Sequence, residues 1–362
     1  MTGKIILLCA GGTGGHLFPA EALAGELAPQ GYVIHLATDE RGAAYTGSFP
    51  AAAVHAIPAE TVRSRSPVAM ANTLWKLGSG AFSAWRMLGR VRPAVVVGFG
   101  GYPTVPPLLA AAWRGIPTLI HEQNAVMGRA NRLLAGRVTR IATGFPEVAK
   151  VDAAARTKLV HTGNPVRAAV IAAAARPWAA PAEAIRLLVF GGSQGARVMS
   201  DIVPAAIALL GADLKARLSI VQQARGEDEA RVREAYAALG VSAEIAPFFK
   251  DLPDRIADAH LIIGRGGAST VAELAVIGRP SILVPLPGAL DQDQAANARA
   301  LAAAGGATVV MQDAFTPQAL AAGLTAMLSD PVGLTRMATA ARSAGSADAA
   351  ARVAAEVVKL AG

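Results

Sequence analysis

A run of glycine, hydroxyl and charged residues in the last third of the chain has the spacing of an anion-binding turn. It is HLIIGRGGASTVAEL, residues 260–274. Three apolar residues predict a buried strand, the glycines predict a tight turn, and Ser269 and Thr270 stand where a helix would begin. Backbone N–H groups at a helix N-terminus bind anions, Arg265 would add positive charge, and Glu273 would accept hydrogen bonds. The combination suits a phosphorylated sugar or a nucleotide, but a plain capped turn between strand and helix has the same pattern.

A second glycine loop follows the first predicted strand of the chain. Residues 4–10 are mostly apolar, and the segment GGTGGH, residues 11–16, separates them from a helix with apolar periodicity. This order of elements also lets a backbone approach phosphate or sugar closely. The dinucleotide fingerprint G-x-G-x-x-G is incomplete, because Leu17 occupies the third glycine position. A nicotinamide or flavin enzyme is therefore disfavoured.

The same order of elements occurs twice, which predicts the fold. Strand, glycine loop and helix at residues 4–28 recur at residues 185–210, and short apolar strands follow each copy. Two doubly wound units of this kind predict an α/β protein with two Rossmann-like domains that face each other across a cleft. We expect the domains to be residues 1–166 and 167–345. We expect the last helix, about 346–362, to pack back on the first domain.

Composition restricts the class of protein. The chain has 362 residues, of which 53% are hydrophobic and 17% charged, as expected of a folded globular protein. Its single cysteine, Cys9, permits no internal disulfide and favours a reducing compartment. The apolar N-terminal run is too short for a signal peptide, and glycines and prolines interrupt the uncharged span 94–113, so we expect no membrane-spanning segment. No metal-ligand cluster is recognisable among the six histidines and one cysteine, so we expect no metal.

The net charge of +8 lies in the first half of the chain. Residues 1–163 hold 16 Lys and Arg against 8 Asp and Glu, whereas residues 164–362 hold 18 of each. Residues 67–90 alternate apolar and basic side chains and include tryptophans. Such a segment covers a sheet in any fold of this kind, but it can also lie among anionic lipid headgroups. The charge alone would suit either a membrane surface or nucleic acid.

Polar residues also cluster where other predicted strands end. The loop GFGGY follows a strand at residues 93–98, HEQN follows one at 118–120, and PGALDQDQAANA follows one at 281–285. Open α/β sheets place their ligands at these strand ends. The amides and carboxylates of the last loop suit sugar hydroxyl groups, and they are equally compatible with a solvated, capped loop.

Seven motifs occur in the order found in a known enzyme family: GGTGGH, GFGGY, HEQN, GNPVR, GGSQGA, GRGGASTVAE and DQDQAANA. Over essentially its whole length the chain resembles the MurG family, the UDP-N-acetylglucosamine (UDP-GlcNAc) transferases of bacterial cell-wall synthesis. The resemblance implies a GT-B fold and an inverting transfer of N-acetylglucosamine (GlcNAc) to the muramyl 4-hydroxyl of lipid I, undecaprenyl-pyrophosphoryl-MurNAc-pentapeptide, which yields lipid II. It also implies a peripheral protein at the cytoplasmic face of the bacterial inner membrane, with no cofactor and no nucleic-acid partner. The basic, apolar first domain would then contact an anionic membrane surface.

The resemblance further implies which residues bind the donor in the second domain. Glu273 would accept both ribose hydroxyls, and backbone N–H groups of the same helix would hold the diphosphate. The backbone at Phe249 would contact the uracil edge, and Gln294 would bind the GlcNAc hydroxyls. Ser193 and Arg167 would add phosphate contacts. The full expected set is Arg167, Ser193, Phe249, Ala268, Ser269, Thr270, Val271, Ala272, Glu273 and Gln294.

From the first domain, the resemblance implies that Thr13, Gly14, Gly15 and Asn124 close on the donor sugar. His16 is the candidate general base for the acceptor hydroxyl, and an equally good interpretation is that it holds its loop by hydrogen bonding. A helix dipole and an arginine can stabilise the departing UDP without a metal.

Two alternatives remain at this stage. A different GT-B protein, such as another lipid glycosyltransferase or a UDP-GlcNAc epimerase, would share Glu273 and the glycine turns but should lack the combination of HEQN and GNPVR. A nucleotide-binding regulator that only docks on membranes would need no catalytic base.

Overall fold

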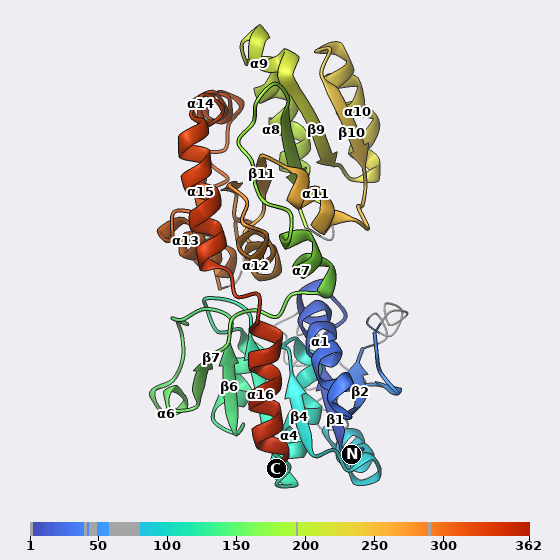
Figure 1. Ribbon diagram of the computed structural model, residues 1–362. Coiled ribbons are helices and arrows are strands. Elements are labelled where there is room, and N and C mark those ends of the chain that lie inside the picture. The colour runs from blue at the N-terminus through green and yellow to red at the C-terminus, as the bar shows by residue number, and fades with distance from the viewer. Residues whose placement is uncertain (1–2, 40–41, 43–48, 58–79, 193–194, 289–290) are drawn as a thin grey trace. The chain divides into compact units, whose positions relative to one another are not determined.

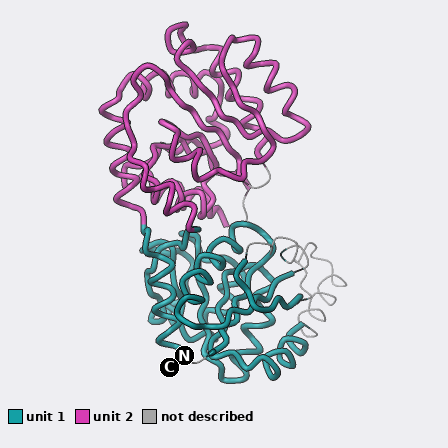
Figure 2. Tube along the Cα trace, turned by 45° about the vertical axis from the view of Figure 1, so that its right-hand side comes forward, with its two compact units in different colours: residues 1–167, 346–362 teal, residues 168–345 magenta. Residues whose placement is uncertain are grey.

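The computed structural model describes residues 3–39, 42, 49–57, 80–192, 195–288 and 291–362. The chain divides into two compact units (Figure 2). Unit 1 comprises Met1–Arg167 and Ser346–Gly362, and unit 2 comprises Ala168–Gly345. No helix in these described ranges is long and apolar enough to cross a membrane.

Unit 1 is built on a parallel sheet whose described strands have the order β3-β2-β1-β4-β5-β6-β7 (Figure 1). The strands are β1 (Ile5–Cys9), β2 (Val33–Thr38), β3 (Ala53–Ala56), β4 (Val95–Gly98), β5 (Thr118–Glu122), β6 (Arg140–Thr143) and β7 (Leu159–His161). The strand order reverses between β1 and β4, which are hydrogen-bonded neighbours. The loops that follow these two strands therefore lie side by side at the carboxyl end of the sheet, where open α/β sheets bind ligands.

Helices cover both faces of this sheet. They are α1 (Gly14–Leu27), α4 (Val105–Trp113), α5 (Arg129–Ala135), α6 (Ala153–Arg156) and α16 (Ala349–Ala361), with short 3₁₀ helices η1 (Ala28–Gln30) and η3 (Tyr102–Thr104) and a further helix at residues 80–91. Successive side chains of a strand point to opposite faces. Accordingly Ile6 of β1 belongs to one buried cluster, and the next residue, Leu7, belongs to another.

The last helix of the chain belongs to unit 1. Helix α16 lies beside α1 (Figure 1). Its Val353 and Val357, four residues apart and therefore on one helix face, are fully buried in the same cluster as Ile6 and Leu23. Burial of two valines contributes roughly 3 kcal/mol or more to the stability of unit 1.

Unit 2 repeats the same design with the strand order β10-β9-β8-β11-β12-β13. Its strands are β8 (Ile185–Phe190), β9 (Leu218–Gln223), β10 (Ser242–Ala246), β11 (Leu261–Gly264), β12 (Ser281–Leu283) and β13 (Ala307–Val309). Its helices are α7 (Ala168–Ala174), α8 (Arg197–Ala208), α9 (Ala212–Arg217), α10 (Gly226–Ala238), α11 (Leu252–Asp258), α12 (Ala268–Ile277), α13 (Asp293–Ala303), α14 (Pro317–Leu328) and α15 (Pro331–Ala344). Here the order reverses between β8 and β11, the two strands followed by glycine loops.

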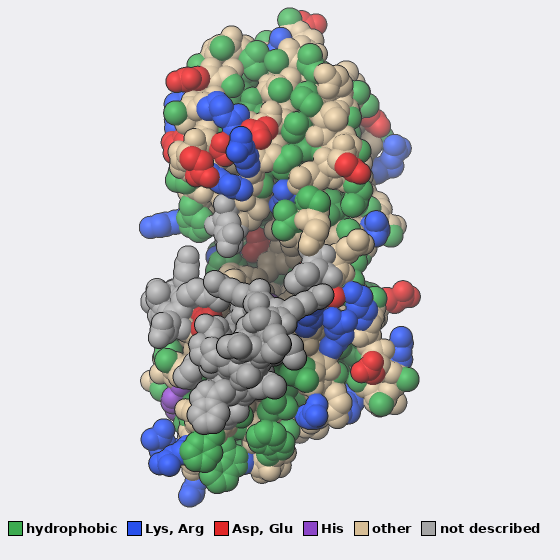
Figure 3. Space-filling view, turned by 180° about the vertical axis from the view of Figure 1, so that it is seen from behind, with side chains coloured by type: hydrophobic (Ala, Val, Ile, Leu, Met, Phe, Trp, Pro, Cys, Tyr) green, Lys and Arg blue, Asp and Glu red, His purple; other side chains and the backbone are tan. Residues whose placement is uncertain are grey.

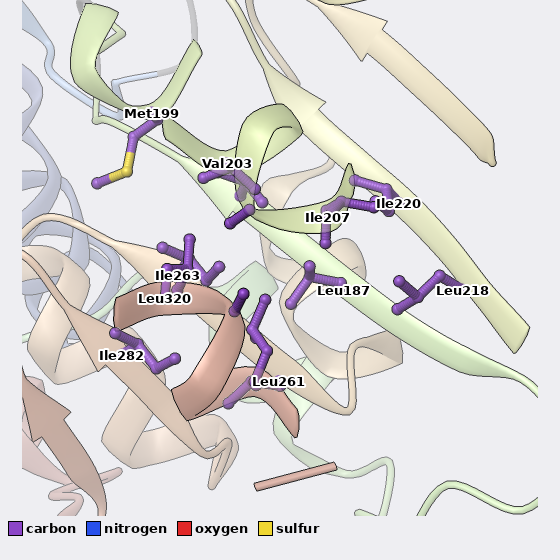
Figure 4. Close-up of a cluster of buried hydrophobic side chains, with 14 of the residues drawn as sticks. Leu187, Met199, Val203, Ile207, Leu218, Ile220, Leu261, Ile263, Ile282 and Leu320 are labelled. Carbon is purple, nitrogen blue, oxygen red and sulfur yellow. The ribbon is translucent and has the colours of Figure 1, made fainter. Parts of the chain in front are cut away.

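The core of unit 2 is mainly aliphatic. Figure 4 shows Leu187 of β8, Val203 of α8, Ile220 of β9 and Ile263 of β11 among the side chains that gather between sheet and helices. The central strands are apolar at nearly every position, as expected for a parallel sheet that helices cover on both faces.

The predicted α/β class with two parallel sheets is confirmed. Two strands were not predicted, β3 and β13, with the sequences AVHA and ATV. Both lie at a sheet edge and have only three or four residues, some of them exposed, so neither forms the continuous apolar run typical of the central strands. The predicted boundary at 166/167 lies one residue before the division between the two units.

Candidate active site

The carboxyl end of the unit 2 sheet opens into a pocket of about 930 Å³. Its walls come from the loops after β8, β9, β10, β11 and β12, together with the first turn of α12. The volume is at the upper end of the range for small-molecule and cofactor sites. The glycine loop after β8 and the turn after β11 contribute to the same pocket through Gly192 and Gly267.

Helix α12 starts at this pocket with free backbone donors. Gly267 precedes its first turn, and no side chain of the described residues caps the N-terminus. Gly267 and Thr270 line the pocket. A Cβ atom at the neighbouring Gly266 would lie 2.3 Å from the Gln294 backbone oxygen, so only glycine allows this turn to approach α13. The uncapped N–H groups and the positive end of the helix dipole suit a diphosphate.

Arg265 adds a buried positive charge to the pocket wall. Its guanidinium donates to the carbonyl oxygens of Val284 at 3.0 Å and Pro285 at 3.2 Å and to Oε1 of Gln312 at 2.8 Å. In the described part of the chain no carboxylate lies within ion-pair distance of it. Burial lowers the pKa of the guanidinium, but an arginine remains charged at neutral pH. This unneutralised charge favours an anionic ligand.

Two further predicted donor residues have defined surroundings in unit 2. The side chain of Glu273 is buried, and its residue is only 6% exposed. Glu273 lies on the same face of α12 as Ser269 and Thr270, because residues three and four positions apart are neighbours on a helix. Gln294 lines the pocket and accepts the Leu286 N–H on its Oε1 at 3.0 Å. Its amide NH₂ group has no partner among the described residues and is available to a ligand.

Gln223, which the sequence did not indicate as a site residue, connects two of the loops that line this pocket. Its Nε2 donates to the Gly192 oxygen at 2.9 Å and the Pro247 oxygen at 3.1 Å, and its Oε1 accepts the Gly191 N–H at 2.9 Å. The glycine loop after β8 is thereby attached to the loop after β10. A single glutamine at the end of a strand gives no sequence signal for this role, which depends on the strand order.

Several of the predicted donor residues do not line the pocket. Phe249 is one of them, and its ring packs under the Arg255 guanidinium at 4.3 Å. Pro247, two residues earlier, lines the pocket instead. The α12 residues other than Thr270 do not line it either. Arg167 belongs to unit 1, where its guanidinium lies 3.9 Å from the Phe18 ring centre. Ser193 lies outside the described residues.

In unit 1 the candidate base His16 lies at the start of α1. Thr13 precedes the first turn, which again has no side-chain cap among the described residues, and Thr13 and Gly15 are exposed. The His16 ring packs against the loop after β4. Gly100 in that loop has a φ of +90°, and a Cβ atom there would lie 3.2 Å from Cε1 and 3.3 Å from Nδ1 of His16. The positive φ favours glycine at this position, and a Cβ atom would also press on the His16 ring.

The surroundings of His16 keep its imidazole neutral. Burial lowers the pKa of His16, and the nearby Phe99 carbonyl, Asp39 carboxylate and Gln123 side chain oppose this effect. Nδ1 of His16 is fully buried and has no partner at hydrogen-bonding geometry among the described residues. A neutral imidazole can accept a proton at neutral pH, which a general base requires.

The HEQN segment after β5 connects the loops at this end of the unit 1 sheet. Glu122 is buried, and its two carboxylate oxygens accept hydrogen bonds from the Asn124 N–H at 2.9 Å, the Gly128 N–H at 2.9 Å and Asn131 Nδ2 at 2.8 Å. Asn124 Nδ2 also donates to Glu122 Oε1 at 3.2 Å. Burial raises the pKa of Glu122, and these donors oppose the rise. Glu122 therefore fixes the loop that carries Asn124.

His121 and Gln123 link the same segment to its neighbours. Nε2 of His121 lies 3.0 Å from the Gly163 oxygen, and burial lowers the pKa of His121 to about 4, so this histidine is neutral and donates. Gln123 Nε2 donates to the Phe99 oxygen at 2.8 Å, beside Gly100. The loops after β4, β5 and β7 are thus held together by side chains of one four-residue motif.

Neither unit offers an evident metal site, since no group of three or more His, Cys, Asp or Glu side chains in the described ranges could hold an ion.

Two doubly wound parallel units, with glycine loops and uncapped helix N-termini at their strand ends, are the architecture of the GT-B fold. Comparison with known proteins gives the family. The N-terminal domain of glycosyltransferase family 28 matches residues 6–143, and the C-terminal domain of the same family matches residues 186–353. The chain belongs to glycosyltransferase family 28.

Its relatives agree with the resemblance predicted from the seven motifs. A protein of Rhodopseudomonas palustris (strain ATCC BAA-98 / CGA009) is 58% identical over 352 residues, which are 97% of this chain and 96% of that protein. A protein of Methylobacterium sp. (strain 4-46) is 59% identical over 99% of this chain and 97% of its own. Both are named UDP-N-acetylglucosamine--N-acetylmuramyl-(pentapeptide) pyrophosphoryl-undecaprenol N-acetylglucosamine transferase. The crystal structure of Acinetobacter baumannii MurG has a TM-score of 0.80 at 30% identity and covers 98% of this chain and 99% of that one. The prediction of membership in the MurG family is therefore confirmed.

Proposed function

We propose that the protein transfers GlcNAc from UDP-GlcNAc to the muramyl 4-hydroxyl of lipid I and so forms lipid II for peptidoglycan synthesis. The observation that carries the proposal is the 58% identity with a transferase of this name over nearly the whole of both chains. The unit 2 pocket supports it, because an uncapped helix N-terminus and the buried Arg265 suit the diphosphate of a nucleotide sugar.

In the proposed reaction the two units have different roles. Unit 2 binds the donor, with Glu273 on the ribose, the start of α12 on the diphosphate and Gln294 on the sugar. Unit 1 supplies His16, which takes the proton of the 4-hydroxyl as the oxygen attacks the anomeric carbon. The bond from that carbon to the UDP oxygen breaks in the same step, with inversion. The negative charge that develops on UDP is stabilised by the positive end of the α12 dipole and by arginine.

The function is tested with the full-length protein, labelled UDP-GlcNAc and a lipid I analogue. We expect label to move to the lipid. We also expect UDP-GlcNAc at about 100 times its dissociation constant to stabilise the fold by about 2.7 kcal/mol, and NAD to have no effect. A UDP-GlcNAc epimerase would instead change the donor sugar when no acceptor is present. Stabilisation by NAD alone, without transfer, would contradict the proposal.

We further propose that unit 1 docks on an anionic membrane surface at the cytoplasmic face of the bacterial inner membrane. Three large aromatic side chains are exposed in the described part of unit 1: Phe82 (61%), Trp85 (43%) and Trp113 (65%). We call these three residues the aromatic patch. The Phe82 and Trp85 rings stack with centroids 6.5 Å apart, and the Arg114 guanidinium lies 3.9 Å from the Trp85 ring centre. Figure 3 shows hydrophobic side chains next to Lys and Arg on the part of unit 1 at the bottom of the view.

The helix at residues 80–91 explains why the sequence allowed both a packing role and a membrane role. Ala84 and Leu88 are buried in the core, whereas Phe82, Trp85 and Arg86 on the opposite side are exposed. One face packs on the sheet and the other is free for lipid. The rest of the predicted amphipathic segment, residues 67–79, lies outside the described residues.

Charge reversal tests the membrane proposal. The variant Arg86→Glu/Arg90→Glu is expected to bind anionic liposomes at least about tenfold more weakly, because each basic residue near the surface contributes about 1 kcal/mol. Binding of the wild type should also weaken as salt is raised. The matched control reverses two exposed arginines of unit 2, Arg299→Glu/Arg336→Glu. Binding that is insensitive both to salt and to the unit 1 reversal would show that the patch acts by apolar contact alone.

A further inference from the structure

Only one ring nitrogen of His16, Nε2, can accept a proton from a substrate hydroxyl in this structure. Nδ1 is fully buried, so no substrate hydroxyl can reach it, and a base must use Nε2. A neutral imidazole carries one proton, and the nitrogen that accepts cannot be the one that bears it. If His16 is the base, Nδ1 must therefore carry the hydrogen and must have an acceptor.

Two groups lie close to the buried side of the ring, the Phe99 carbonyl and the Gln123 side chain, and both affect the pKa of His16. Neither is at hydrogen-bonding geometry with Nδ1 in this structure. The position that a Cβ atom would take at Gly100 lies 3.3 Å from His16 Nδ1 and 3.7 Å from Gln123 Oε1, so these two atoms flank the same glycine. Gln123 is only 3% exposed.

The orientation of the Gln123 amide follows from its partners. Its nitrogen donates to the Phe99 oxygen at 2.8 Å, which only an NH₂ group can do, so its oxygen is on the other side. Its backbone is also fixed, because Asn164 Nδ2 donates to the Gln123 carbonyl at 2.9 Å. Gln123 thus holds the Phe99 carbonyl in place and presents a second acceptor beside it.

We propose that Gln123 is a positioning residue for His16. When the ring adjusts to hydrogen-bonding geometry, Gln123 and the Phe99 carbonyl accept Nδ1–H. This fixes the tautomer of the imidazole and leaves the Nε2 lone pair for the acceptor hydroxyl. This inference rests on the proposed role of His16 as the base of the transfer reaction. The arrangement places a neutral amide where many functional histidines have a carboxylate. A neutral amide thus orients the base, and the charge of the Asp39 carboxylate separately raises the pKa of His16.

Two substitutions of Gln123 should move the pH profile of kcat/KM in opposite directions. In Gln123→Glu a carboxylate beside Nδ1–H raises the pKa of His16. The pH below which activity is lost therefore moves to a higher value than in the wild type. In Gln123→Met the amide acceptor is gone and the Phe99 carbonyl loses the donor that holds it. The pKa of His16 then falls further and the unproductive tautomer becomes populated. The acid limb then moves to lower pH and kcat falls on the order of 10- to 100-fold, with little change in the KM for UDP-GlcNAc. A purely structural role would not produce shifts of opposite sign.

The matched control is Gln222, a buried glutamine of unit 2 whose Oε1 accepts the Tyr236 hydroxyl at 2.5 Å. Gln222→Glu and Gln222→Met should change stability but keep the wild-type pH profile.

Nitrogen-15 NMR of the histidine rings, with His16→Gln to assign the signal, reports the tautomer directly and needs no turnover. We expect Nδ1–H in the wild type and a mixture in Gln123→Met. If Gln123→Glu does not fold, the Gln123→Met profile and spectrum decide the question.

The outcomes separate this inference from the proposed function. If the wild type transfers GlcNAc but Gln123→Met keeps its pH profile and its tautomer, Gln123 does not position His16 and the function stands. If the wild type transfers nothing, the function fails, and the NMR spectra alone decide whether Gln123 sets the tautomer.

Discussion

Replacing His16 by glutamine is expected to lower kcat for GlcNAc transfer on the order of 10²- to 10⁴-fold and to leave UDP-GlcNAc binding intact. Glutamine has nearly the reach of histidine and can still form hydrogen bonds in the space beside Gly100, but it cannot take up a proton near neutral pH. The substitution therefore separates the two interpretations of His16 left open by the sequence. If His16 only held its loop, His16→Gln would retain most of the activity. Thermal stabilisation by UDP-GlcNAc checks that the donor still binds.

The pH dependence gives an independent check on the same residue. Burial lowers the pKa of His16 below the ordinary value of 6.5, so the base is neutral at pH 7. Activity should therefore persist somewhat below pH 6.5 and disappear as the pH falls through the lowered pKa. The residual activity of His16→Gln should lack this acid limb. An identical limb in wild type and variant would assign it to another group and remove His16 as the base.

The sheets could be predicted because their central strands carry the signal in consecutive residues. In unit 2, β8 and β11 are apolar runs that end at glycines, and such runs identify buried parallel strands without any tertiary information. The edge strands β3 and β13 lack this signal, since they are short and covered on fewer sides.

The candidate sites were predicted at the level of loops and less well at the level of side chains. HEQN was identified as a polar loop at a strand end, yet two of its members bond to other loops. His121 donates to Gly163 and Gln123 donates to Phe99. Which loops are neighbours depends on the strand order, and the order of β4, β5 and β6 cannot be deduced from the local sequence around residue 122. Gln223 was missed for the same reason.

At two positions the surroundings of a predicted donor residue could not be deduced from the resemblance. Pro247 lines the unit 2 pocket and Phe249, two residues later, does not. Arg167 was assigned to the donor domain, and it stacks on Phe18 in unit 1. The position of each side chain depends on its packing partner, which is Arg255 for Phe249 and Phe18 for Arg167. The donor contacts predicted for the Phe249 backbone and for Arg167 stay predictions.

Replacing Glu273 by glutamine is expected to raise the KM for UDP-GlcNAc on the order of 10- to 100-fold, with a smaller effect on kcat. The carboxylate is buried on α12, on the same helix face as Thr270 at the pocket, and we propose that it accepts both ribose hydroxyls. Hydrogen bonds to a charged group contribute about 1.5–3 kcal/mol each, and the neutral amide offers only one oxygen acceptor. The loss should therefore fall on donor binding and not on the chemical step.

The ribose contact can be isolated by comparing UDP with 2′-deoxy-UDP as inhibitors. The wild type should bind UDP about tenfold or more tightly than 2′-deoxy-UDP, because the deoxy compound leaves a buried acceptor unpaired. In Glu273→Gln this preference should largely vanish. The matched control is Glu227→Gln, which removes an exposed carboxylate from the rim of the same pocket and should keep the preference. If Glu273→Gln discriminates between the two nucleotides as well as the wild type does, Glu273 does not contact the ribose, and its burial then serves the packing of α12.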